Sequence, residues 1–286
     1  VNEALNYLHS LNKTTIILSN TASRSKIAKK RYAQLGLPSH YTDFITSGEA
    51  SSQYLYDNYR GKKCTWITWS RYSKDKTLHE LEIQAADIRD ADFLFLHGTQ
   101  TVVNSLSEES LNKPTNFFAD GDVTHPLIEE IITIGIERKI PAICANMDLT
   151  AMAYGQTAYM PGKIMKEYER RGGCVISFGK PMKEFFDFAI SKAPSSVLNP
   201  SLGKRTRRRI IHVGDSLHHD IAGAHATGID SLLITEHGVH SKVLHLPEDA
   251  AISHEEKCSA VLSRVLRVCD EESVPRPSYI LGSFTK

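Results

Sequence analysis

The stretch IIHVGDSLHHD, residues 210–220, is the part of this sequence that decides the fold. Its apolar run, residues 210–213, predicts a strand, and Gly214 loosens the turn that leads from this strand into a helix. In α/β folds, ligands bind in the crevice beyond the carboxyl ends of parallel strands. Asp215 stands at that position and Asp220 follows about one helical turn later. Their carboxylate oxygens are the ligands that Mg²⁺ prefers, so the stretch predicts a metal site.

A structural alternative remains for the same residues. Asp215 and Asp220 could both serve the start of one helix, where Ser216 is a suitable N-cap and acidic groups favour the helix dipole. The nearby His212, His218 and His219 could ligate a metal, but HxxxxxHH has no common ligand spacing and the neighbouring carboxylates favour a hard ion. We therefore expect structural or solvent-facing roles for the three histidines.

Strand-like and helix-like segments alternate along most of the chain, which predicts a mainly parallel sheet covered by helices. A long middle segment between two strand-and-helix blocks indicates an inserted domain, and glycines near 61 and 172–173 offer points of exit and return. We expect a core domain in two parts, residues 1–61 and 175–286, with an inserted domain at 62–174. Within the insertion, Thr124 is available as the N-cap of a helix at 126–139. The expected strands are at 14–20, 44–46, 64–69, 93–96, 140–144, 175–178, 210–213, 231–235 and 279–281.

Composition restricts the class of protein. The chain has 286 residues, 41% hydrophobic and 23% charged, which is enough for two ordinary globular domains. Its net charge of +1 gives no global field that would attract nucleic acid or an anionic membrane, and the basic run KRTRRR at 204–209 reads as a solvated loop. No apolar stretch reaches the roughly 20 residues needed to cross a bilayer. Five scattered cysteines without metal or redox spacing fit a reducing compartment, so we expect a cytoplasmic protein.

Two further strand ends carry polar side chains. Ser19 and Asn20 close the strand at 14–20, where a hydroxyl, an amide and backbone N–H groups could bind a phosphate oxygen or could merely cap the next helix. Lys180 follows the strand at 175–178 and Gly179, so its ammonium could neutralise a phosphoryl group or could lie on the surface. Neither segment decides the question by itself.

In this order, the strand-end Ser, the strand-end Lys and the Gly-Asp turn with a second Asp resemble the haloacid dehalogenase superfamily of hydrolases. The similarity is closest to subclass IIA, which has a large α/β cap of the C2 type and includes p-nitrophenylphosphatase-like and phosphoglycolate phosphatase-like proteins. The stretches that carry it are ILSNTASRS at 17–25, CANMDLT at 144–150, PGKIMKEYERRGGCVISFGKP at 161–181 and HVGDSLHHDIAGAHATGIDSLLITEHGVH at 212–240.

The resemblance implies an α/β protein with a Rossmann-like parallel-sheet core, the first strand of which is missing from this chain, and an inserted α/β cap domain. It implies that Ser19, Lys180 and Asp215 are catalytic, and that Ser19, Asn20 and Lys180 bind the phosphoryl group. Asp215 would bind Mg²⁺. Asp220 would not bind the ion itself but would hold in place the groups that do.

At the return from the cap, relatives usually carry Asn-Pro-Asp where this chain has Asn146-Met147-Asp148. Asn146 and Asp148 could still face the substrate entrance, although a purely structural loop is an equal alternative. Caps of this subclass often dimerise, so by analogy a homodimer is expected.

The family's nucleophile is the first Asp of a DxDG motif on the first core strand, and the second Asp is its acid and base. Asp120-Gly121-Asp122 has similar residue types but no preceding strand, so we expect an exposed turn there. The resemblance places the true motif upstream of the helix expected at 2–11. The leading hypothesis is a Mg²⁺-dependent phosphatase of a small phosphorylated metabolite that acts through an aspartyl phosphate, its nucleophile encoded upstream. The alternative is a non-catalytic phosphate-binding or regulatory homologue that has lost the nucleophile.

Overall fold

The structure, a computed structural model, describes residues 2–37, 40–72, 77–104, 113–153, 155–195, 210–244 and 253–283. Its contacts divide the chain into two compact units. The first unit contains Val1–Ile17, Tyr32–Asp43 and Lys180–Lys286, and the second contains Leu18–Arg31 and Phe44–Gly179. The segment expected as an insertion, residues 62–174, lies within the second unit, and the expected domain boundaries stay a prediction.

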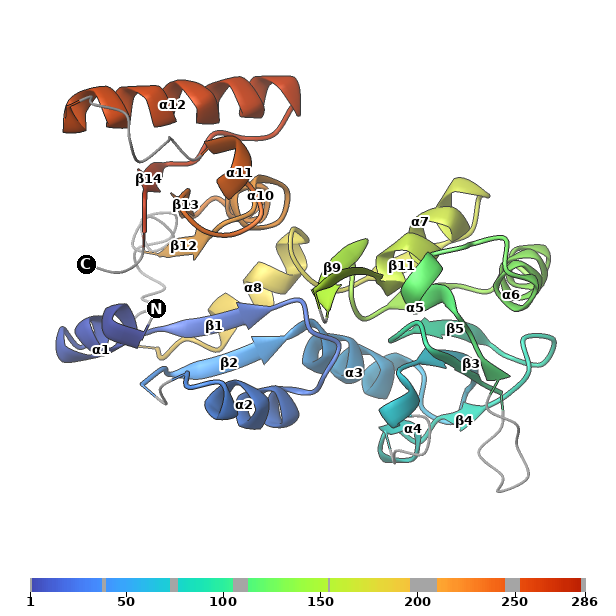
Figure 1. Ribbon diagram of the computed structural model, residues 1–286. Helices are drawn as coiled ribbons and strands as arrows, with labels where there is room; N and C mark the ends of the chain where they lie inside the picture. The colour runs from blue at the N-terminus through green and yellow to red at the C-terminus, as the bar shows by residue number, and fades with distance from the viewer. Residues whose placement is uncertain are drawn as a thin grey trace. The chain divides into compact units, whose positions relative to one another are not determined.

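The second unit is built on one mixed sheet with the strand order β11-β8-β5-β3-β6-β7, in which β4 pairs with β3. Strands β3, β4, β5 and β11 of this sheet are labelled in Figure 1. Strands β3, β4, β5, β8 and β11 are parallel to one another, and β6 and β7 are antiparallel to their neighbours. The expected strands near 64–69, 93–96, 140–144 and 175–178 are confirmed. The bounds are β3 (Lys63–Thr68), β4 (Gln84–Ala85), β5 (Phe93–Leu96), β6 (Thr101–Val103), β7 (Lys113–Pro114), β8 (Ala142–Cys144) and β11 (Val175–Ser177).

Both faces of this sheet are buried, which explains why its strands are apolar without alternation. Successive residues point to opposite faces, so Leu94 and Leu96 join one core cluster and Phe93 and Phe95 the other. Helices α6 (Pro126–Glu137) and α7 (Pro161–Arg170) contribute to the first cluster, and α3 (Ser47–Asn58) and α4 (Thr77–Glu80) contribute to the second. The parallel-sheet architecture follows from this two-sided burial.

The start of α6 corrects one expectation. His125, not Thr124, is the N-cap, and its Nδ1 accepts a hydrogen bond of 3.3 Å from the Leu127 N–H. Thr124 instead donates its N–H and its hydroxyl to the Asp122 carboxylate, at 2.8 and 2.7 Å. The Asx turn formed by Asp122 therefore removes the threonine from the cap position.

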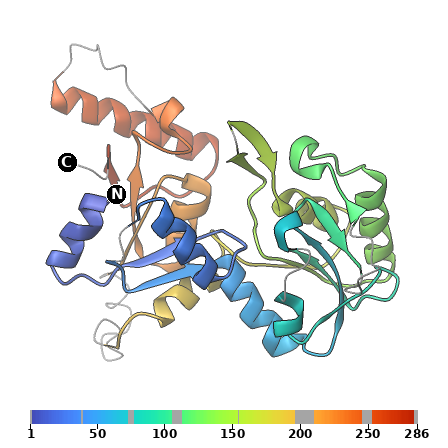
Figure 2. The ribbon, with the colours of Figure 1, turned by 60° about the horizontal axis from the view of Figure 1, so that its bottom comes forward.

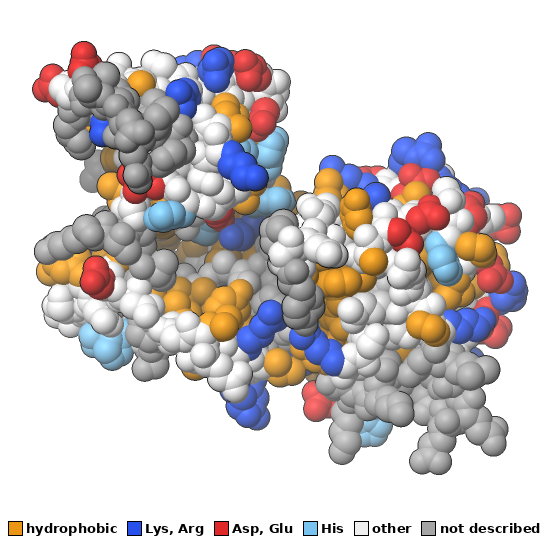
Figure 3. Space-filling model, in the orientation of Figure 1, with side chains coloured by type: hydrophobic (Ala, Val, Ile, Leu, Met, Phe, Trp, Pro, Cys, Tyr) orange, Lys and Arg blue, Asp and Glu red, His pale blue; other side chains and the backbone are white. Residues whose placement is uncertain are grey.

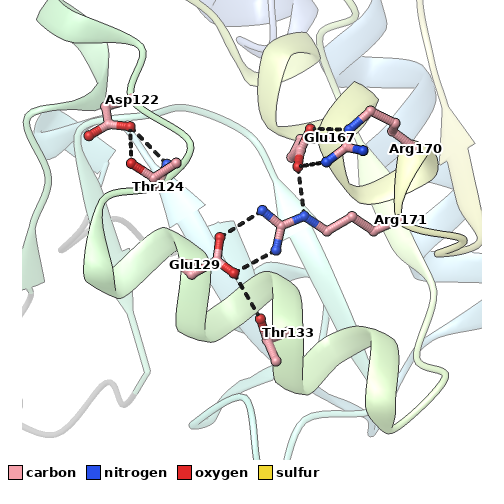
Figure 4. Close-up of polar contacts among 7 residues, drawn as sticks. All are labelled: Asp122, Thr124, Glu129, Thr133, Glu167, Arg170 and Arg171. Atoms are coloured by element: carbon pink, nitrogen blue, oxygen red, sulfur yellow. Dashed lines mark hydrogen bonds and ion pairs between the residues drawn. The ribbon is translucent and has the colours of Figure 1, made fainter.

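An ionic network joins α6 to α7 (Figure 4). Arg171 donates to both oxygens of Glu129 at 2.6 and 2.7 Å, and its Nε donates to Glu167 at 2.6 Å. Arg170 forms a second pair of hydrogen bonds with Glu167. Hydrogen bonds from Arg170 and Arg171 lower the pKa of Glu167 to about 2. Through Arg171, the network links the end of α7 to α6 within the second unit.

The Asp120-Gly121-Asp122 segment is a turn, as expected. It ends α5 (Phe117–Asp120), and Gly121 takes the left-handed conformation at φ 63° while both aspartates are exposed. The hairpin of β9 (Thr150–Ala153) and β10 (Gln156–Tyr159), which the sequence did not predict, packs its second strand against α5.

The first unit contains a three-stranded parallel sheet, β12-β13-β14, formed by β12 (Ile211–Gly214), β13 (Asp230–Ile234) and β14 (Tyr279–Leu281). Helix α12 (His254–Glu271) packs on it through a core cluster that includes Val265, Val268 and Leu233 (Figures 1 and 2). The unit also contains α1 (Asn2–Ser10), α8 (Lys183–Ser191), α10 (Ala222–Thr227) and α11 (Ser241–Leu244).

Strands β1 (Ile16–Ser19) and β2 (Asp43–Thr46) form a separate two-stranded sheet, and α2 (Ser25–Gln34) lies between them in the chain. Among the strands that the structure describes, β1 pairs only with β2 and β12 only with β13. The expectation of an α/β protein with a parallel-strand core and an α/β cap is confirmed.

No helix in the described ranges is both long and apolar enough to cross a membrane. The basic run at 204–209 lies outside the described residues. On the face drawn in Figure 3, Lys and Arg side chains are interspersed with acidic and uncharged ones.

Candidate functional site

The first unit brings Lys180 and Asp220 together. The Lys180 ammonium donates to Asp220 Oδ1 at 2.7 Å, and the side chains are 17% and 3% exposed. The other carboxylate oxygen, Oδ2, accepts the Ser216 N–H at 3.1 Å. Lys180 follows β11, and the buried Asp220 lies in the helical turn after β12, so the pair joins two segments that are 40 residues apart in the chain.

His212 is a third member of this cluster, which sequence reasoning missed. Its Nε2–H donates to Asp220 Oδ1 at 2.8 Å, and the edge of the Phe186 ring packs on it with ring centroids 4.9 Å apart. The available signal was the two-residue period of a strand, which places His212 and Gly214 on one face, the face against which Asp220 lies. The expectation of a structural or solvent-facing role for His212 missed this contact with a site residue.

The charge state of Asp220 follows from its partners. Burial by itself would raise its pKa, but the hydrogen bond from His212 and the charge of Lys180 outweigh burial and hold the pKa well below its usual range. Asp220 is therefore ionised over the physiological range. A charged carboxylate fixes the direction of an ammonium that donates to it, here that of Lys180.

Local sequence explains why the carboxylate fits at this position. A Cβ atom on Gly214 would lie 2.1 Å from Asp220 Cγ, so only glycine allows the acid to lie against the strand end. Ser216 is the N-cap, as expected, because its Oγ accepts the His219 N–H at 3.2 Å. The following π-helical turn, Leu217–Ile221, carries Asp220 back to the strand.

Asp215 lies directly after β12. Its Oδ2 accepts the Val239 N–H at 2.8 Å, and Gly238, at φ 93°, comes so close that a Cβ there would lie 1.8 Å from the same oxygen. This approach orients the Asp215 carboxylate from the loop that follows β13.

Of Asp215 and Asp220, Asp215 is the one suited to bind a divalent ion. Mg²⁺ in phosphoryl-transfer sites commonly takes one or two carboxylates and completes its shell with water and phosphate oxygens. Asp215 is suited to be such a ligand, whereas the oxygens of Asp220 already accept from Lys180, His212 and Ser216. No group of three or more His, Cys, Asp or Glu side chains in the described part of the chain is arranged to hold a metal.

The second unit brings together another set of predicted residues. Asn20 Nδ2 donates to Asp148 Oδ1 at 2.9 Å, and the Asp148 N–H donates to Asn146 Oδ1 at 2.8 Å. Ser19 ends β1, and its Oγ accepts the Thr21 N–H at 3.3 Å. The loop after β1 is therefore tied to the loop that carries Asn146 and Asp148.

Gly162 allows the start of α7 to lie close to the 146–148 loop. A Cβ on Gly162 would lie 2.1 Å from the Met147 carbonyl oxygen, and the Gly162 N–H donates to the Asp148 carbonyl at 3.1 Å. The start of α7 thus packs directly against the backbone of the 146–148 loop.

The predicted residues therefore form two groups: Lys180, Asp215 and Asp220 belong to the first unit, and Ser19, Asn20, Asn146 and Asp148 to the second. The convergence of the two groups on one cavity stays a prediction.

Two family models match the chain. A HAD-hydrolase-like model matches residues 177–284, and a haloacid dehalogenase-like hydrolase model matches residues 1–84. The first range contains Lys180, Asp215 and Asp220, and the second contains Ser19 and Asn20. No match was found among curated protein sequences.

Solved structures share the fold over nearly the whole chain. A haloacid dehalogenase-like hydrolase from Brucella suis superposes with a TM-score of 0.67 at 20% identity, covering 98% of this chain and 86% of that one. For a p-nitrophenyl phosphatase from Archaeoglobus fulgidus the TM-score is 0.61 at 18% identity, with 99% and 88% covered. For a possible sugar phosphatase from Cytophaga hutchinsonii it is 0.63 at 21% identity, with 100% and 87% covered. Both family models that match describe the same class of hydrolase and these structures share its fold, so the chain belongs to the haloacid dehalogenase-like hydrolases.

Proposed function

We propose that this protein is a Mg²⁺-dependent phosphatase of a small phosphorylated metabolite and that the reaction passes through an aspartyl phosphate. The nucleophilic Asp would come from residues encoded before Val1. The observation that supports the proposal most is the buried Lys180–Asp220 pair, because it maintains a fixed positive charge in the unit that also carries Asp215. Relatives of the same fold include a protein described as a p-nitrophenyl phosphatase.

Each side chain has a definite task in this proposal. Lys180 would neutralise the phosphoryl group and the attacking carboxylate, and Asp220 and His212 would hold its ammonium in place. Ser19 and Asn20 would donate hydrogen bonds to the phosphoryl oxygens. When bound, Mg²⁺ would supply charge neutralisation at the phosphoryl oxygens, and Asp215 would be its ligand from this chain.

Residues 62–174, which lie within the second unit, would act as the cap. Asn146 and Asp148 would line the entrance through which the substrate's leaving group passes, and closure of the cap would exclude water from the reacting bond. Five free cysteines support a reducing, cytoplasmic location, and by analogy with capped relatives we propose a homodimer.

One observation favours a second candidate function. The 286 residues contain no DxDG motif at a strand end, and Asp120-Gly121-Asp122 forms an exposed turn instead. A homologue that has lost its nucleophile would keep a phosphate pocket and act in binding or regulation.

The test uses the gene product that includes the residues encoded upstream of Val1, assayed with p-nitrophenyl phosphate with and without Mg²⁺. We expect turnover that requires the metal and that falls at least a hundredfold in Lys180→Met, because an uncompensated phosphoryl charge would remain in the transition state. Lys183→Met is the matched control, since Lys183 is 45% exposed and pairs with Asp187 on its own helix. An absence of metal-dependent turnover in the extended protein would favour the binding homologue.

A further inference from the structure

A buried polar cluster in the second unit lies where β3 and β5 end. His97, directly after β5, is 5% exposed. Its Nε2 lies 3.0 Å from the Ala22 carbonyl oxygen, and its Nδ1 lies 2.8 Å from the Thr68 hydroxyl. One imidazole therefore connects the ends of two strands to the loop after β1.

The partners of His97 fix its tautomer. A carbonyl oxygen can only accept, so Nε2 carries the hydrogen and donates it to Ala22. Nδ1 is then the acceptor for the Thr68 hydroxyl. Tyr72 packs edge-on against the ring, with centroids 5.2 Å apart, and Trp66 and Phe95 pack at 5.7 Å. The ring has a single orientation in which both nitrogens are satisfied.

The loop at 20–25 has further contacts with the same unit. The Thr21 carbonyl accepts from Ser47 Oγ and from the Gly48 N–H, each at 3.1 Å. A Cβ on Gly48 would lie 1.9 Å from the Ala22 carbonyl oxygen, so the start of α3 packs directly on the loop backbone. His97 is the side chain that approaches this carbonyl from the sheet.

Asn20 begins this loop and donates to Asp148 at 2.9 Å. Only Thr21 lies between Asn20 and Ala22, whose carbonyl His97 holds, so displacement of Ala22 must displace the backbone from which the Asn20 amide extends. We propose that His97 is a positioning residue: by fixing the Ala22 carbonyl it holds Asn20 in its place beside Asp148. The consequence for phosphate recognition rests on the proposed function, whereas the loop geometry does not.

A pair of amide substitutions separates the two hydrogen bonds of His97. The amide of His97→Gln can reach the position of Nε2 and donate to Ala22, whereas the shorter His97→Asn can occupy only the position of Nδ1 beside Thr68. Both variants lose the aromatic ring. The loss of the ring should lower the global stability of both variants alike, so a difference between them reports on the hydrogen bond to Ala22.

The first measurement is hydrogen exchange of the amides at 20–24 in the 286-residue chain. Loss of one buried hydrogen bond makes local opening easier by about tenfold. We expect exchange about tenfold faster in His97→Asn than in His97→Gln. Equal exchange in the two His97 variants would overturn the proposal.

If neither His97 variant folds, ¹⁵N NMR of the wild-type chain decides instead. An Nε2–H tautomer with a slowly exchanging ring proton supports the proposal, and an Nδ1–H tautomer overturns it. In the extended protein, His97→Asn should raise the KM for p-nitrophenyl phosphate several-fold more than His97→Gln does. Complete absence of turnover in wild type would contradict the phosphatase proposal alone, because the exchange and NMR measurements do not depend on activity.

Discussion

Substitution of Asp220 by Asn tests the charge pair at the centre of the candidate site. The change keeps the shape of the side chain but removes its charge, which leaves the Lys180 ammonium, 17% exposed, beside a neutral amide. Breaking a buried ion pair from one side costs about 3–5 kcal/mol. The residual exposure of Lys180 lets water solvate part of its charge, so we expect the lower end, about 3 kcal/mol.

Urea unfolding of wild type and Asp220→Asn measures this loss directly. At about 2–4 °C per kcal/mol for a domain of this size, the same change lowers Tm by roughly 6–12 °C. The double variant Lys180→Met with Asp220→Asn should recover part of the loss, because no uncompensated charge remains. Asp215→Asn is the matched control: that carboxylate accepts one backbone N–H of 2.8 Å and should lose only about 1 kcal/mol. A loss below 1 kcal/mol in Asp220→Asn would refute the reasoning.

The same pair predicts a pH dependence with a definite sign. The pKa of Asp220 in the folded protein is lowered, because the hydrogen bond from His212 and the charge of Lys180 outweigh the effect of burial. Its stabilisation is therefore complete above the unfolded pKa, near 3.8, and is lost as the pH falls through the lower folded value. Below about pH 4, the stability of wild type should fall more steeply than that of Asp220→Asn.

Three other changes test the second unit. Gly162→Ala should cost more than about 2 kcal/mol in denaturant unfolding, since the new Cβ would lie 2.1 Å from the Met147 carbonyl oxygen; a neutral result would contradict the packing. Arg171→Met should lose about 1 kcal/mol near pH 7. The difference from wild type should shrink as the pH falls from about 4.5 towards 2, because Glu167 has a pKa lowered to about 2. Tyr168→Phe should cost about 1–2 kcal/mol, because the hydroxyl donates at 2.7 Å to a buried backbone carbonyl; calorimetry showing no loss would count against that bond.

Local pattern was enough to predict much of the fold. The two-sided burial of a parallel sheet makes strands such as β5 continuously apolar, and the FLFL run at Phe93–Leu96 is therefore visible without any tertiary information. The turn at Asp215 and the N-cap at Ser216 depend on residues within a few positions of each other, so the sequence predicted them as well. The β9–β10 hairpin was missed because its short strands show no clear two-residue alternation.

The amino-acid sequence by itself determined the family, the positions of the strand ends and the residue types at those ends. These features depend only on short segments and their order in the chain. Tertiary structure alone decided which partner each polar group has. The contacts of His212 with Asp220 across 8 residues, of Asn20 with Asp148 across 128, and of His97 with Ala22 across 75 are set by packing. A buried donor takes whichever acceptor the fold brings within about 3 Å, and no local sequence rule specifies that acceptor.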